Sequence, residues 1–310
     1  MIRLGASAPG KALLCGEYAV LEGAPAIVAA VDRRVEANWS DDEAPMPPEV
    51  LATLERAQRR CGSVPGSLRI DASRLRRDRV KLGLGSSAAA AVAAAGAVFA
   101  THGQDLSDPV VVRRVFECAF DGHAAVAPQG SGVDVAASAF GGFLRFVRDE
   151  REIHTEPCSA PAELEIHLVW TGHAARTSDL VARVRELQGR DPRRFAASMD
   201  RLKELASQFA NAFQHADAES VVELARAYSE AMASLGQAAG APIVEARLQA
   251  ARALAARFSG SAKPCGAGGG DVAIAFFTDT DAARAFELAC GQEGLHPIEV
   301  CWGARGVQAV

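Results

Sequence analysis

Hydrophobic and polar positions alternate in short runs along the first third of the chain, and turn-forming residues separate the runs. This period of two predicts β-strands, because successive side chains of a strand point to opposite faces of a sheet. The predicted strands are residues 2–8, 12–15, 26–30, 35–39 and 67–71. Apolar residues at helical spacing predict helices over residues 48–60, the alanine-rich residues 86–101, and residues 108–125.

The second half of the chain is dominated by long stretches with helical periodicity. Strand-like runs are predicted first, at residues 135–147 and 165–170. Helices follow over residues 177–187, 192–215, 218–235 and 242–258. The tail returns to short elements: a strand at 271–277, a helix at 280–293 capped by Gly294, and strands at 298–302 and 306–310. We therefore expect an α+β fold with two domains, residues 1–170 and residues 171–310.

Composition and charge narrow the class of protein. The 310 residues are 49% hydrophobic with a mean hydropathy of +0.05, which suits a globular protein with a sizeable core. No apolar stretch reaches the ~20 residues of a membrane span, so we expect no membrane partner. A net charge of −5 argues against nucleic acid as a partner.

The N-terminal residues and the cysteines bear on the compartment. The first residues lack the apolar core and cleavage site of a secretory signal. The seven cysteines are an odd number without paired spacing, which favours neither a disulfide framework nor a zinc site. We expect a cytoplasmic protein.

The lysines are few and unevenly placed. Among 33 basic residues only four are lysines, and three of these, Lys11, Lys81 and Lys263, lie in glycine-rich segments. A compact ammonium differs from the planar guanidinium of arginine as a phosphate ligand. The distribution indicates lysines placed near phosphate, with chance as the alternative.

The strongest chemical signal is a glycine-rich turn that leads directly into the alanine-rich helix. It reads Gly83-Leu84-Gly85-Ser86-Ser87-Ala88. Such a turn directs several backbone N–H groups and the positive end of the helix at one point, which suits a phosphate chain. The serine hydroxyls can bind phosphate or Mg²⁺. The alternative interpretation is a simple helix start with serine caps.

Two common phosphate-binding patterns fit this turn poorly. The Walker A pattern is absent, because no glycine-rich loop ends in Gly-Lys-Ser or Gly-Lys-Thr. Gly83, Gly85 and Ala88 satisfy the dinucleotide-binding pattern, which also requires a strand and an acidic residue after the helix. Residues 101–109 instead have the composition of a loop. Dinucleotide binding remains a weaker alternative.

Two further segments carry candidate chemistry. Residues 261–271 contain the run Gly266-Ala-Gly-Gly-Gly270, which indicates close approach to a ligand or, alternatively, a hairpin turn. Residues 7–21 include Lys11, for which Asp134 is a candidate partner. A lysine and an aspartate at one substrate hydroxyl would serve phosphoryl transfer. From the residues alone Asp134 could equally be a turn residue.

These three segments, in this order, resemble the motifs of the GHMP kinases. Those enzymes have a proline-glycine-lysine stretch near the N-terminus, a central GLGSS loop and a C-terminal GAGGG loop, so the resemblance spans the chain. It implies a two-domain fold, with an N-terminal domain like ribosomal protein S5 that binds ATP and a ferredoxin-like α+β C-terminal domain. It also implies ATP and Mg²⁺ as cofactors.

The resemblance assigns roles to individual residues. It implies Lys11 and Asp134 as the catalytic pair and Gly83, Leu84, Gly85, Ser86, Ser87 and Ala88 as the cradle for ATP, with Ser87 as the metal contact. It implies that the substrate side is lined by Glu17, Tyr18, Ser131, Gly266 and Ala267.

Within the family the motifs are most similar to those of phosphomevalonate kinases. Mevalonate kinases usually have histidine in place of Tyr18, proline in place of Gly130, and a magnesium-binding glutamate in place of His123. The resemblance implies phosphorylation of the small molecule 5-phosphomevalonate, with mevalonate as the alternative acceptor. A catalytically silent nucleotide sensor and, less well matched, a diphosphomevalonate decarboxylase are further candidates. A homodimer is one assembly that the sequence allows.

Overall fold

The computed structural model describes residues 2–42, 45–78, 80–149, 152–174 and 177–310. It confirms the α+β class. The chain forms two compact units that take alternating segments of the sequence. Unit 1 comprises residues 1–12, 28–144 and 301–310, and unit 2 comprises residues 13–27 and 145–300. The predicted domain boundary between residues 170 and 171 stays a prediction.

Unit 1 contains most of a sheet whose longest strands are β1 (Ala6–Cys15) and β2 (Ala26–Ser40), and the pairs β1–β12 and β2–β3 are antiparallel. The strand order is β12 (Gln308–Ala309), β1, β2, β6 (Phe143–Arg148), and β3 (Ser67–Asp71) also pairs with β2. Residues of β1 are buried along almost the whole strand. A small hairpin, β4 (Arg76–Arg77) and β5 (Val80–Lys81), lies just before the glycine-rich turn.

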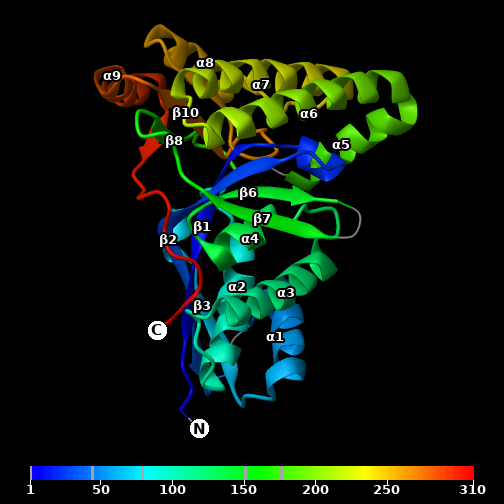
Figure 1. Ribbon diagram of the computed structural model, residues 1–310, viewed down its shortest axis with the longest axis vertical. Coiled ribbons are helices and arrows are strands. Elements are labelled where there is room, and N and C mark those ends of the chain that lie inside the picture. The colour runs from blue at the N-terminus through cyan, green and yellow to red at the C-terminus, as the bar shows by residue number, and fades with distance from the viewer. Residues whose placement is uncertain (1, 43–44, 79, 150–151, 175–176) are drawn as a thin grey trace. The chain divides into compact units, whose positions relative to one another are not determined.

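Four helices accompany this sheet (Figure 1). They are α1 (Pro48–Cys61), α2 (Ser86–Thr101), α3 (Pro109–Val126) and α4 (Val133–Phe140). Residues 88–101 of α2 are all buried, which explains why small alanines fill that helix. Helices α1 and α3 approach closely, because a Cβ on Gly122 would lie 2.1 Å from Thr53 Oγ1. Helices α1 and α3 are therefore closely packed against each other.

Unit 2 combines a second sheet with long helices. The sheet has the order β11 (His296–Ile298), β8 (Glu165–Trp170), β10 (Val272–Phe277), β9 (Ser261–Pro264), and all three pairings are antiparallel. Strand β7 (Ile153–Cys158) and residues 145–148 of β6 also belong to this unit, and β7 pairs with β6, not with the second sheet. Every residue of β10 is buried, as expected for a central strand.

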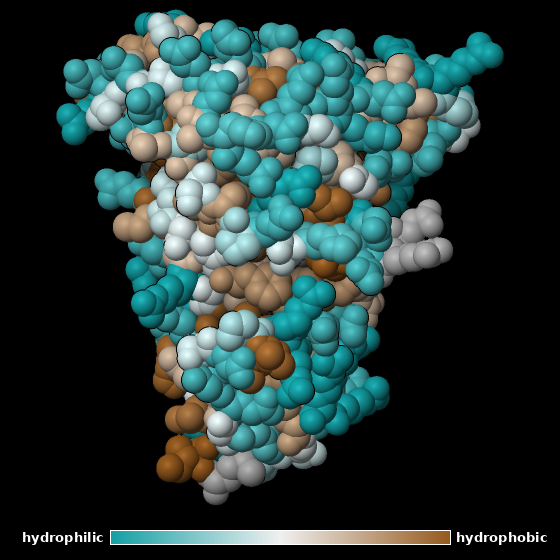
Figure 2. All heavy atoms as spheres, in the orientation of Figure 1, coloured by the Kyte–Doolittle hydropathy of each residue, from teal (hydrophilic) through white to brown (hydrophobic). Residues whose placement is uncertain are grey.

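Unit 2 also contains a set of helices, most of which are amphipathic. They are α5 (Thr177–Arg190), α6 (Pro192–Gln214), α7 (Ala218–Ala239), α8 (Ala246–Arg257) and α9 (Thr280–Cys290). Helices α6 and α7 lie side by side (Figure 1), and the face seen in Figure 2 over these helices is mostly hydrophilic. Their apolar residues are buried at helical spacing, which is the pattern that predicted them.

Three predicted elements need correction. Residues 135–147 are not one strand: residues up to Phe140 form α4, and β6 begins at Phe143. All-round burial of α4 hides the helical period, because its polar face is missing. Strand β1 is continuous through Pro9 and Gly10, where the sequence suggested a break. The strand predicted over residues 298–302 is instead β11, which ends at Ile298.

In the described part of the chain, no helix combines the length and the apolar character that a membrane span requires.

Burial of thiols predicts a loss of stability at alkaline pH. Burial raises the pKa of Cys118 and of Cys158 to about 11 and that of Cys290 to about 12, from an ordinary 9.0. Between pH 9 and 11 the unfolded chain releases these protons and the native protein keeps them, so stability falls as pH rises. For each thiol, the free energy of unfolding falls by at most ~1.4 kcal/mol per pH unit.

Urea unfolding at pH 8 and pH 10.5 measures this effect. A Cys118→Ala variant should show a shallower fall than the parent protein. Equal free energies of unfolding at the two pH values would contradict the assignment.

Candidate active site

Helix α2 begins without a side-chain cap. Its N-cap residue is Gly85, at φ 77° and ψ 34°, a left-handed conformation that glycine adopts readily. Because glycine has no side chain, the N-cap residue cannot accept a hydrogen bond from the N–H groups of the first turn. That turn also contains no acidic residue. The serine caps considered as an alternative are therefore not formed. The N–H groups and the positive end of this helix can serve an anion.

Other helices of the chain do use carboxylates as caps. Helices α3, α6, α7, α8 and α9 start at acidic residues whose side chains accept hydrogen bonds from first-turn N–H groups: Asp108, Asp191, Asp217, Glu245 and Asp279. A carboxylate at such a position satisfies the N–H groups that a phosphate would otherwise bind. Helices α1 and α4 also begin without a side-chain cap, but each has an acidic residue in its first turn, whereas the first turn of α2 has none.

Lys11 lies against this turn. Its backbone N–H donates to the carbonyl of Leu84 at 2.9 Å. A Cβ on Gly85 would lie 2.9 Å from Lys11 Cγ and 3.0 Å from its Cε, so the aliphatic part of the lysine crosses the turn. The glycine at position 85 leaves the space that the lysine occupies. The structure thereby brings a predicted catalytic cation next to the predicted phosphate cradle within unit 1.

A pocket adjoins the start of α2. It has a volume of about 620 Å³, and its lining includes Ser86, Ser87, Ala90, Lys81 and Arg76. Apolar side chains of β3, among them Leu68 and Ile70, complete one wall. A concave site with apolar walls and a few cations next to an anion-binding turn suits a nucleotide. Sequence reasoning missed this wall, because β3 lies well before the turn in the chain and carries no motif.

Ser87 has a neighbour that the sequence did not pair with it. Its Oγ lies 3.3 Å from Nε2 of His123, which is on α3. In the described residues no group of three or more histidine, cysteine, aspartate or glutamate side chains could hold a metal. A Mg²⁺ ion here would have to be held mainly by phosphates and water, a common arrangement for this ion, and the contact with the Ser87 hydroxyl stays a prediction.

Asp134 lies in the first turn of α4, not in a turn between strands. Its Oδ1 accepts a hydrogen bond from the N–H of Val135 at 3.0 Å. The Oγ of Ser131 accepts one from the N–H of Val133 at 3.3 Å. Within the described residues, no hydrogen bond or ion pair joins Asp134 to Lys11. The suggested pairing of these two groups stays a prediction.

In unit 2 the structure brings together four of the residues predicted for the substrate side. Glu17 is buried, and its Oε1 forms an ion pair with Lys263 and accepts a hydrogen bond from the N–H of Gly266 at 3.3 Å. The hydroxyl of Tyr18 donates to the carbonyl of Ala267 at 2.6 Å. The fifth residue of that set, Ser131, belongs to unit 1.

Lys263 is not the phosphate-facing lysine that its glycine-rich surroundings suggested. It is 1% exposed, and its Nζ is bound by Glu17 and by the carbonyl of Pro264 at 2.8 Å. An ammonium that is buried and paired with a buried carboxylate is not available to a phosphate. The rarity of lysine in this chain did mark position 263 as special, but it could not show the partner.

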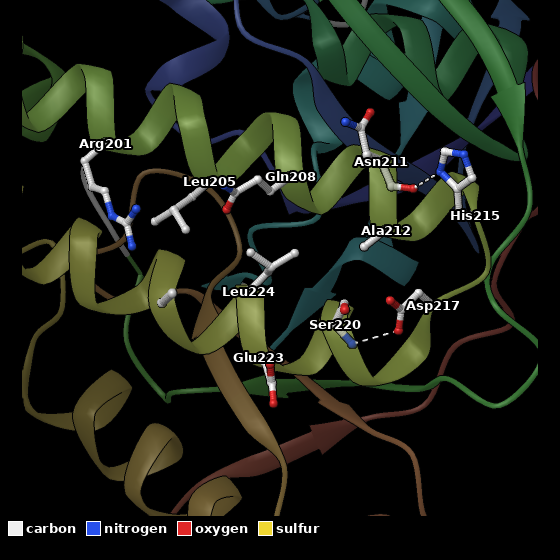
Figure 3. Close-up of a pocket in the computed structure, with 11 residues that line it drawn as sticks. Arg201, Leu205, Gln208, Asn211, Ala212, His215, Asp217, Ser220, Glu223 and Leu224 are labelled. Atoms are coloured by element: carbon white, nitrogen blue, oxygen red, sulfur yellow. Dashed lines mark hydrogen bonds between the residues drawn. The ribbon is translucent and has the colours of Figure 1, made fainter.

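Another pocket lies between α6 and α7 in unit 2 (Figure 3). It has a volume of about 750 Å³ and is lined by mixed polar and apolar side chains, including Arg201, Leu205 and Glu223. His215 is bonded to the carbonyl of Asn211, and Asp217 caps α7. None of the residues predicted for the site lines this pocket.

The chain is similar to known proteins in sequence and in structure. Residues 49–142 match the family model described as GHMP kinases N terminal domain. A phosphomevalonate kinase of Streptomyces sp. (strain CL190) is 28% identical over 342 residues, covering 89% of this chain and 90% of the relative. A mevalonate kinase of Methanothermobacter thermautotrophicus is 30% identical over 289 residues, covering 88% and 90%.

The solved structure of Streptococcus pneumoniae phosphomevalonate kinase in complex with phosphomevalonate and AMPPNP has the same fold. It gives a TM-score of 0.77 at 20% identity and covers 100% of both chains. The matches to kinases along most of the chain define a phosphotransferase. The chain belongs to the GHMP kinase family.

Proposed function

We propose that this protein transfers the γ-phosphoryl group of ATP to the terminal phosphate of 5-phosphomevalonate, giving 5-diphosphomevalonate and ADP. The observation that carries the proposal is the position of Lys11 across the Gly85 turn, at the uncapped start of α2. This position supports a role for the Lys11 ammonium beside the phosphates of a nucleotide bound at that helix start.

Unit 1 is proposed to hold the nucleotide. Residues Gly83 to Ala88 would bind the ATP phosphates with backbone N–H groups, and the adjoining pocket of about 620 Å³ would receive the nucleoside. Ser87 would contact Mg²⁺, which when bound offsets negative charge on the phosphates. His123, beside Ser87, would keep that hydroxyl in place.

The charge of the acceptor explains why Lys11 should contribute more to catalysis than Asp134. In the reaction the bond between the γ-phosphorus and the oxygen that leaves with ADP breaks, and a bond to an acceptor phosphate oxygen forms. That oxygen is already ionised, so a strong general base is not required. The main barrier is electrostatic, because two anions must approach, and the Lys11 ammonium lowers it. Asp134 would then orient the acceptor, and its carboxylate would contribute less to catalysis than Lys11.

Unit 2 is proposed to bind the acceptor mainly through the segment around Glu17. The Glu17 carboxylate, Tyr18, Gly266 and Ala267 form one hydrogen-bonded group there. Ser131 belongs to unit 1, and its contact with the acceptor stays a prediction from the resemblance. The Streptomyces relative and the Streptococcus structure, both named phosphomevalonate kinases, support the choice of acceptor.

The second candidate function is phosphorylation of mevalonate. It is favoured by the 30% identical mevalonate kinase from Methanothermobacter thermautotrophicus, which matches 88% of this chain. His123 speaks against it, because mevalonate kinases usually carry a magnesium-binding glutamate at the corresponding place.

A coupled assay of ADP release distinguishes the two functions. The enzyme is given Mg²⁺ and ATP with either mevalonate or 5-phosphomevalonate at matched concentrations. We expect turnover with 5-phosphomevalonate and little with mevalonate. Turnover of mevalonate alone would establish the second candidate, and no turnover with either acceptor would reject both.

A further inference from the structure

Tyr18 adopts a strained backbone conformation. Its dihedral angles are φ 61° and ψ −50°, outside the regions that residues with a side chain normally occupy. The N–H of Ala19 donates to the carbonyl of Glu17 at 2.6 Å, which closes a three-residue γ-turn around Tyr18. This mirror-image form of the γ-turn is rare and strained. Such strain persists only where surrounding contacts hold the backbone in place.

The first contact that holds the turn comes from α7. The hydroxyl of Tyr228 donates to the carbonyl of Glu17 at 2.7 Å, the same carbonyl that closes the γ-turn. Tyr228 is fully buried, and burial raises its pKa well above the ordinary value, so the hydroxyl keeps its proton and remains a donor. A donor from the buried face of α7 thus fixes the orientation of one peptide group of the turn.

The second and third contacts join the turn to the glycine-rich loop after β9. The Tyr18 hydroxyl donates to the carbonyl of Ala267, and burial raises the pKa of Tyr18 as well. The Glu17 carboxylate is tied through Oε1 to Lys263 and to the N–H of Gly266. The strained turn and the loop therefore hold each other in register.

One polar atom in this group lacks a partner. Oε2 of Glu17 is buried, and no hydrogen bond to it occurs within the described part of the protein. An unpaired buried acceptor costs free energy, which a donor from a bound molecule can recover. Since Oε1 is held by Lys263, the direction of Oε2 is fixed before any ligand arrives.

We propose that Lys263 and Tyr228 are positioning residues for the acceptor: they hold the strained Glu17–Tyr18 turn, and with it the Glu17 carboxylate, in a fixed orientation. This inference rests on the proposed function for the identity of the acceptor. Neither residue is assigned a contact with the reacting phosphates. Their loss should weaken acceptor binding and leave nucleotide binding unchanged.

Tyr228→Phe is the first test, because it removes one hydroxyl and keeps the packing of the ring. The matched control is Ser229→Ala, which removes the neighbouring buried hydroxyl, one that makes no hydrogen bond in the described structure. We expect the KM for the acceptor to rise about tenfold in Tyr228→Phe, with the KM for ATP within about twofold of the parent. Ser229→Ala should leave both values unchanged.

Lys263→Met tests the ion pair and is expected to lower the Tm strongly, because it leaves a buried carboxylate without its cation. The double variant Glu17→Gln with Lys263→Met removes both charges and should recover much of the Tm. The inference requires the acceptor KM to stay high in the double variant although stability returns. An acceptor KM that recovers together with the Tm would show a purely structural pair and overturn the inference.

Hydrogen exchange tests the inference without relying on any acceptor. Peptides covering residues 16–20 and 265–269 should both exchange faster in Tyr228→Phe than in Ser229→Ala. If neither peptide changes, the inference fails. If the parent enzyme phosphorylates neither 5-phosphomevalonate nor mevalonate, the proposed function fails, and the exchange result still decides whether the two residues hold the turn.

Discussion

Replacement of Lys11 by methionine is expected to lower kcat for phosphoryl transfer by about 10²–10³-fold, the usual effect of removing one group that stabilises developing charge. Methionine keeps most of the stem that crosses Gly85 and removes the ammonium. Tm should therefore change little. Steady-state kinetics with Mg²⁺, ATP and the preferred acceptor measure the loss.

A suitable control is Lys203→Met, since Lys203 is on the exposed face of α6 and pairs with Asp200, three residues earlier, at 3.5 Å. It should retain full activity. The variant Asp134→Asn extends the comparison: with an ionised phosphate as acceptor its loss in kcat should be clearly smaller than that of Lys11→Met. Comparable losses at both positions would count against a phosphate acceptor.

Substitution of Gly268 by alanine is expected to destabilise the protein by roughly 2–4 kcal/mol. Gly268 has φ +83°, a conformation that disfavours a side chain, and a Cβ there would lie 2.1 Å from the carbonyl oxygen of Ile243. Backbone atoms cannot move aside as a flexible side chain can. The loop that contains Gly266 and Ala267 would shift, and acceptor binding should weaken as well.

Gly103→Ala provides the matched control for conformation alone. Gly103 has a similar φ of +72°, and no described atom lies within 4 Å of the position that a Cβ would take there. We expect a cost of about 1 kcal/mol for this variant. Chemical unfolding of both variants gives the comparison, and a Gly268→Ala variant no less stable than Gly103→Ala would show that the contact with Ile243 is unimportant.

The long amphipathic helices could be predicted from the sequence because their polar faces are exposed. Helices α6 and α7 are examples, with buried residues at helical spacing and aspartate caps. Helix α4 could not be, since it is buried on nearly every side and Val133, Val135 and the alanines that follow fit a strand equally well. The continuity of β1 was hidden by Pro9 and Gly10, which usually mark a turn.

In the candidate site, too, some residues could be predicted from the sequence and others could not. The glycine-rich turn and Lys11 were found because local sequence specifies both, and the structure brings them together. The role of Tyr228 had no local signal: it contacts Glu17 across 211 positions of sequence, from a helix whose pattern shows only that Tyr228 is buried. Hydrogen bonds of this kind depend on tertiary packing, which a single sequence does not display.

The missing cap of α2 ties the stability of unit 1 to its ligand. Five other helices carry their own carboxylate caps, whereas α2, like α1 and α4, begins without a side-chain cap, and its first turn also has no acidic residue. On the proposed function the phosphates of ATP act as that cap. Bound nucleotide would then stabilise the start of α2, and the stability of unit 1 would rise with the concentration of ATP.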